Sequence, residues 1–199
     1  DSTASRAEHS LTHDKPRFAF FQVFQPRGGG KRQAPTFDVI APGVAKHEEE
    51  IVLAPGAEPA ADPNLVLRVA VAAAEFGLPI APGTLRNLKK CPIGDRNWTD
   101  ESRELFIRLL ASGPALLNVW EDIDFIDVPG KLIPEWLGVR NRPSASAAHR
   151  YTIDRHMVEV VTRLGRETPS GGRYDDRHYE ALLLAGILHD IGKRPGVAN

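Results

Sequence analysis

The sequence predicts a mainly α-helical protein with a small irregular or extended segment at its N-terminus. From residue 62 onward, apolar residues recur mainly at the spacing of amphipathic helices. Each of these segments also has a residue suited to cap or terminate a helix. Before residue 62 the pattern differs, because short β-branched or aromatic runs alternate with Pro- and Gly-containing stretches.

The N-terminal third offers few regular elements. Residues 1–35 are expected to be disordered or irregular, since the first sixteen are polar and contain no aromatic side chain. Within them, Phe18–Phe24 favours a strand, although so short a run leaves a helix open. The glycines of Pro26–Arg32 lack the Gly-Lys-Ser/Thr ending of a phosphate-binding loop, so we interpret them as a flexible basic loop. Residues 36–40 and 50–53 are expected to form a hairpin or two extended segments.

Capping residues define the expected helices. Asp62 is the expected N-cap of the first helix, with Pro63 as its first residue and Gly77 at its end. Thr99 caps a later helix that has acidic residues in its first turn. The helices are expected at residues 62–77, 84–90, 99–113, from 114, 152–165 and 175–191, with a connector at 130–142 and a polar loop at 168–173. Between residues 62 and 125, seven side chains are expected to be buried: Leu67, Val71, Leu85, Phe106, Leu109, Leu117 and Trp120.

Composition excludes several classes of protein. The chain has 199 residues, of which 42% are hydrophobic and 26% charged, and its formal net charge is −1. That balance argues against a nucleic-acid binder, which normally carries a basic excess. The longest apolar run, residues 181–188, is too short to span a membrane. Cys91 is the single cysteine and cannot form an internal disulfide, so a reducing cytoplasm is the expected compartment.

Two histidine-containing segments point to a divalent-metal centre. His189 and Asp190 follow directly on the apolar run, and His156 opens another apolar helix. Imidazole and carboxylate ligands together suit ions such as Mn, Fe, Co or Zn, and tolerate Mg. Adjacent residues project about 100° apart on a helix, so both can bind one ion only from a terminal turn or across a groove. The small residues Ala185 and Gly186 would let the His156 helix approach closely.

Other readings of these residues remain open. His189 could instead cap its helix or bond to a neighbour, and His178 is expected on the surface. His149 is a candidate for binding a substrate phosphate, against a purely structural hydrogen bond.

The histidine-containing segments, together with the residues around them, resemble a known family. His156 and the His189-Asp190 doublet, followed by Ile-Gly-Lys, resemble the HD superfamily of metal-dependent phosphohydrolases. More narrowly, three segments are similar to the family of bifunctional [protein-PII] uridylyltransferase/uridylyl-removing enzymes: Leu132–Trp136, Val139–Pro143 and His149–His156. The resemblance covers about residues 36–195.

This resemblance implies a helical linker array followed by a partial HD-domain helical bundle. Residues 36–142 would be the linker, mostly helical from 62, and residues 143–199 the N-terminal half of the HD domain. The family's nucleotidyltransferase domain, the last metal-binding Asp of the HD centre and the C-terminal sensing modules have no counterpart here. The polar start without Met and the end soon after the motif also suggest a fragment.

The implied chemistry is removal of a nucleotidyl group from the PII signalling protein. His156, His189 and Asp190 would hold the ion, with Mg or Mn expected first and Fe, Co or Zn as alternatives. Catalysis would involve His189, Asp190 and Lys193, the last neutralising charge on the phosphate unless it is a plain surface lysine. The partners implied are PII and a nucleotide, either uridylyl or adenylyl, with no nucleic acid or membrane. This chain alone is expected to bind metal poorly and to be inactive.

Two other functions remain as alternatives. One is a different HD hydrolase that acts on free nucleotides or alarmones. The other is a non-catalytic regulatory module that keeps the HD scaffold for binding only.

Overall fold

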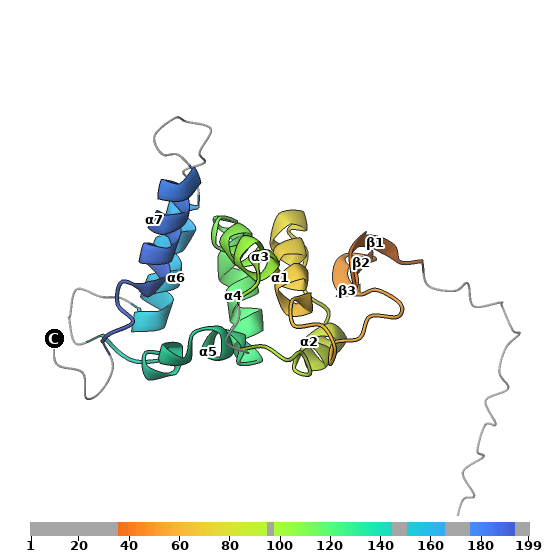
Figure 1. Ribbon diagram of the computed structural model, residues 1–199, viewed down its shortest axis with the longest axis horizontal. Helices are drawn as coiled ribbons and strands as arrows, with labels where there is room; N and C mark the ends of the chain where they lie inside the picture. Colours follow the sequence, from red (N-terminus) through yellow and green to blue (C-terminus); the bar gives the residue numbers. More distant parts are fainter. Residues whose placement is uncertain (1–35, 95–97, 145–150, 166–175, 194–199) are drawn as a thin grey trace, which may run out of the picture. The chain divides into compact units, whose positions relative to one another are not determined.

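A computed structural model describes residues 36–94, 98–144, 151–165 and 176–193, all of which belong to the unit Pro35–Asn199 (Figure 1). Its strands are β1 (Asp38–Ala41), β2 (Val44–His47) and β3 (Glu50–Leu53). Its helices are α1 (Leu65–Phe76), α2 (Pro82–Leu88), α3 (Asp100–Leu110), α4 (Ala115–Phe125), α5 (Val128–Leu132), the 3-10 helix η1 (Pro134–Gly138), α6 (Ile153–Leu164) and α7 (Asp176–Leu188). The predicted mainly helical fold is confirmed.

The three strands form one antiparallel sheet in the order β1-β2-β3. The turn between β1 and β2 contains Gly43, whose φ of +74° suits glycine. Ile51 on β3 also bonds beyond the sheet: its N–H donates to the carbonyl of Pro79 at 2.9 Å, and its carbonyl accepts from the N–H of Ala81 at 3.0 Å. The expected extended segments are therefore present. The sequence reading missed the middle strand, because in β2 two apolar residues are followed by Lys and His.

Helix α1 is the centre of the core. Nine of its residues are buried, which is typical of a helix that is apolar on nearly all sides. It packs against the sheet, α3 and α4. The expected helix end is confirmed, since Gly77 adopts the left-handed conformation and its N–H bonds to the carbonyl of Ala73.

The expected start of α1 is wrong. The helix begins at Leu65, with Asn64 at the cap position. Asp62 lies outside the helix: it accepts the N–H of Asn64 at 3.1 Å and forms an ion pair with Arg68. The Asp62 carboxylate therefore pairs with Arg68, one turn into the helix, instead of capping the helix. The local sequence pattern did not indicate this pairing.

The other expected elements are mostly confirmed. Thr99 caps α3 by accepting the N–H of Ser102 at 3.1 Å, and Pro114 stands immediately before α4. The expected short helix lies two residues earlier, as α2, and the connector contains α5 and η1. Helix α7 ends at Leu188, three residues before the expected end. Phe18–Phe24 and the loop 168–173 lie outside the described residues.

Burial agrees with the expectation at five of the seven positions. Leu67, Val71, Phe106, Leu109 and Trp120 are buried. Leu85 and Leu117 are only partly buried and pack against the edge of the core. In the described part of the chain, no helix is both long and apolar enough to cross a membrane.

Helices α6 and α7 lie side by side and are antiparallel, as His156 near the start of α6 meets His189 just after α7 (Figure 1). The connector fixes the start of α6. The N–H of Ile153 donates to the carbonyl of Arg142 at 2.9 Å, and Asp154 accepts the N–H of Asn141 at 2.8 Å. Arg140, just upstream, pairs with Asp124 at 2.9 Å. These contacts tie the first turn of α6 to α4 and so position His156.

Candidate metal centre

The first ligand candidate, His156, lies in the first turns of α6. The buried face of this helix, which includes Met157, Val158 and Val161, belongs to the core. His156 is only half-buried and points to the neighbouring α7. Because the core face and the docked connector both hold α6, the imidazole is presented from a rigid element.

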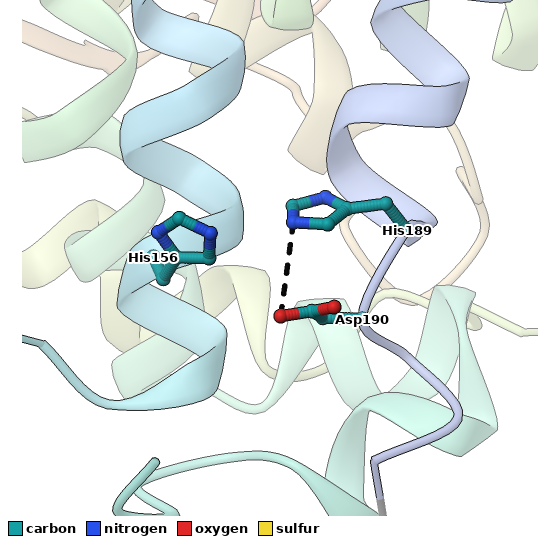
Figure 2. Close-up of side chains that lie close together, drawn as sticks. All are labelled: His156, His189 and Asp190. Carbon is teal, nitrogen blue, oxygen red and sulfur yellow. Dashed lines mark ion pairs between the residues drawn. The ribbon is translucent and has the colours of Figure 1, made fainter. Parts of the chain in front are cut away.

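The second and third candidates, His189 and Asp190, lie in the turn that follows α7. The helix ends at Leu188, and the N–H of Ile191 donates to the carbonyl of Leu188 at 3.0 Å. Two adjacent side chains on a regular helix diverge by about 100°. The turn removes that restriction, so both His189 and Asp190 border the same space as His156 (Figure 2).

Gly186 allows the two helices to come this close. A Cβ atom at Gly186 would lie 2.8 Å from Leu164 Cδ1 and 3.1 Å from Val161 Cγ2. Both distances are shorter than ordinary van der Waals contacts, so the α6 side chains occupy the space that a side chain would need. The expected role of small residues is confirmed at Gly186, whereas Ala185 is exposed.

The three side chains form a compact cluster. One ligand atom from each of His156, His189 and Asp190 can be chosen so that all lie within 4.8 Å of one another. The two imidazole centroids are 5.2 Å apart with an interplanar angle of 76°. The predicted convergence of these residues is therefore confirmed.

The hydrogen bonding of His189 suits a metal ligand. Its Nδ1 lies 2.8 Å from the carbonyl oxygen of Gly186, which can only accept. Nδ1 must therefore carry the hydrogen, and in the neutral ring this leaves a lone pair on Nε2. Nε2 is the atom that faces Asp190, at 3.7 Å from Oδ2 (Figure 2). A carbonyl that orients the far nitrogen is the usual arrangement behind a metal-bound histidine. The sequence reading did not identify this acceptor, although the i−3 spacing could have suggested it.

Asp190 is buried and ionised. Burial raises the pKa of its carboxyl group, but the hydrogen bond from Lys193 and the nearby positive charges outweigh that effect, so the pKa is lowered. Lys193 Nζ donates to Oδ2 of Asp190 at 2.9 Å. The carboxylate therefore carries its negative charge at neutral pH.

The donor set fits a divalent ion. Two neutral imidazoles and one carboxylate are suitable ligands for Mn, Fe, Co or Zn, and bonds of about 2.0–2.2 Å require the ligand atoms to draw closer together around the ion. Of the other candidates, His178 is exposed on α7, as expected. His149 lies outside the described residues.

Comparison with known proteins agrees with the resemblance. The chain is 40% identical to a Streptomyces coelicolor protein over 169 residues, which are 84% of this chain and 19% of that protein. It is 39% identical to a Mycobacterium tuberculosis protein over 155 residues, or 77% of this chain. A Corynebacterium glutamicum protein is 34% identical over 132 residues, or 66% of this chain. All three are named bifunctional uridylyltransferase/uridylyl-removing enzyme.

The chain is homologous to one segment of these enzymes. It spans about a fifth of the length of the relatives it matches. No protein-family model and no solved structure gives a significant match.

Proposed function

We propose that this chain is a segment of a bifunctional [protein-PII] uridylyltransferase/uridylyl-removing enzyme and that it carries metal ligands of the removing reaction. In this proposal residues 36–142 are the linker, mostly helical from residue 62, and residues 143–199 begin the HD domain. The observation that carries the proposal is the convergence of His156, His189 and Asp190 from two helices. The names of the relatives support the uridylyl group as the one removed.

The proposed reaction is hydrolysis of a phosphodiester. Water adds to phosphorus, the bond to the oxygen of the modified PII side chain breaks, and the nucleoside monophosphate leaves. The proton that water loses balances the one that the released side-chain oxygen takes up. A divalent ion at the cluster would supply Lewis-acid polarisation and a water of lowered pKa.

The residues of the chain have separate parts in this reaction. His156 and His189 present nitrogen lone pairs, and the carbonyl of Gly186 keeps His189 in the required tautomer. Asp190 contributes the negative charge of the ligand set. Lys193, at the open side of the turn, supplies a positive charge for the phosphate oxygens. Three protein ligands leave positions for substrate oxygens or for a carboxylate from elsewhere in the longer enzyme.

The test uses the full-length enzyme that contains this segment. His189→Ala and Asp190→Ala should each abolish removal of the nucleotidyl group from PII, while attachment continues, because the proposal places attachment in another domain. Loss of a direct ligand should exceed the roughly 10–100-fold effect of changing an outer partner. His178→Ala is the matched control, since His178 is exposed on the same helix. A doubly substituted enzyme that still removes the group at the wild-type rate would contradict the proposal.

A further inference from the structure

Lys193 engages the carboxylate oxygen that a metal ion would use. Its Nζ is 2.9 Å from Oδ2 of Asp190, and the same oxygen lies 3.7 Å from Nε2 of His189. The side chain of Asp190 is only 11% exposed, whereas that of Lys193 is 45% exposed. A half-exposed cation is thus paired with a buried anion.

This pairing has an electrostatic reason. A buried carboxylate without a counter-charge is unfavourable, and an imidazole supplies that charge only when it is protonated. Within the described residues, Asp190 forms ion pairs with Lys193 and, when the ring is protonated, with His189. Lys193 is therefore the permanent counter-charge of the cluster when no metal is bound.

The turn that carries Lys193 is exposed. Gly192 precedes Lys193, and a Cβ at Gly192 would meet no atom within 4 Å. The N–H of Lys193 is held by the carbonyl of Asp190 at 3.0 Å, so the turn is retained while the long side chain is free to turn outward. A Lys side chain has many rotamers that reach solvent.

We propose that Lys193 is a displaceable counter-ion of the metal centre: it holds Asp190 in place in the metal-free protein and leaves Oδ2 when a divalent cation binds. This inference rests on the proposed function. The released ammonium group then stands at the mouth of the site, where it meets the phosphate oxygens of the substrate. One lysine thus neutralises the carboxylate before metal binding and the phosphate afterwards.

The proposal predicts opposite effects of one substitution. Removing the ammonium group leaves Asp190 without its counter-charge, so the metal-free protein should become less stable. The same change removes a cation that competes with the metal, so metal binding should become tighter. A lysine on the surface with a merely structural role would not increase metal affinity when it is removed.

The test measures binding of Mn²⁺, and separately of Zn²⁺, to the full-length enzyme that contains this segment by calorimetry, together with chemical unfolding of the metal-free protein. Lys193→Gln should bind Mn²⁺ about 2- to 5-fold more tightly, as expected for loss of a partly exposed competing ion pair. Its metal-free form should unfold at a lower denaturant concentration. Lys90→Gln is the matched control, because Lys90 is exposed and its Nζ bonds the uncharged Oδ1 of Asn87 at 2.9 Å, also three residues back. That control should change neither quantity.

A double-mutant cycle separates the possible outcomes. In an Asp190→Asn background, Lys193→Gln should no longer tighten binding, because the shared oxygen has lost its charge. Weaker or unchanged binding by Lys193→Gln, when the wild type binds the ion, would overturn this inference and leave the proposed function standing. A full-length wild-type enzyme whose binding of both ions is unchanged by His156→Ala would overturn the proposed metal centre itself.

Discussion

Gly186 is the position where a small change should disturb both packing and the metal centre. A Cβ there would lie 2.8 Å from Leu164 Cδ1 and 3.1 Å from Val161 Cγ2. The Leu164 terminus can rotate away, but Val161 is β-branched and fully buried, so its χ1 angle is restricted. A valine at 186 adds two further methyl groups to the same contact. The most direct relief is separation of α6 from α7.

The magnitude follows from two opposing effects. Replacing glycine inside a helix by alanine gains about 1 kcal/mol of helix propensity. Overpacking a well-filled contact costs about 1–3 kcal/mol. Gly186→Ala should therefore lower the free energy of unfolding by roughly 0–2 kcal/mol. Gly186→Val loses much of the propensity gain and should cost about 2–3 kcal/mol, which lowers the melting temperature by about 4–12 °C in a chain of this size.

Thermal unfolding followed by circular dichroism measures this effect, and metal binding provides a second readout. Separation of the helices should move His156 from His189 and weaken metal binding in Gly186→Val. Ala185→Val is the matched control, because Ala185 is exposed on the same helix and should cost only about 0.5 kcal/mol of helix propensity. If Gly186→Val proves as stable as Ala185→Val, the α6–α7 contact is not close packed and the reasoning is wrong.

Two further predictions concern the core. Trp120 is 4% exposed and packs edge-on against Trp136 at 5.2 Å, while its Nε1 has no hydrogen-bond partner among the described residues. Trp120→Ala should lower the free energy of unfolding by about 3–5 kcal/mol. Trp120→Phe should lower it much less, because phenylalanine keeps most of the buried ring and removes an N–H that has no acceptor. Equal losses for the two variants in urea titrations would contradict this prediction. Burial, with a smaller contribution from Asp62, raises the pKa of the Cys91 thiol from 9.0 to about 11. Since the unfolded thiol ionises first, the wild type should lose stability relative to Cys91→Ala as pH rises from about 9 to about 11, by up to roughly 2–3 kcal/mol. A constant difference between the two proteins across that pH range would show that the folded thiol ionises normally.

Local sequence rules predicted the elements whose stability depends on nearby residues. Thr99 caps α3 because its hydroxyl accepts an N–H only three residues away. Gly77 ends α1 because a left-handed residue is needed at that point. The predictions were wrong where the structure of a segment depends on a partner outside the local capping or strand pattern. Asp62 lies outside α1 because it pairs with Arg68, and β2 forms because neighbouring strands on both sides complete its hydrogen bonds.

In the candidate site, too, some features follow from the sequence alone and others from tertiary packing. Sequence alone identified His156, His189 and Asp190, because these residue types suit a divalent metal and follow a known motif. It also predicted that a small residue would bring two helices together, which depends only on side-chain volume. Tertiary structure alone decided that Gly186, rather than Ala185, faces α6, because the rotation of α7 about its axis is set by packing over its whole length. It also placed the ammonium group of Lys193 on Asp190, because the charge of a buried carboxylate must be balanced by whichever cation the folded turn brings within reach.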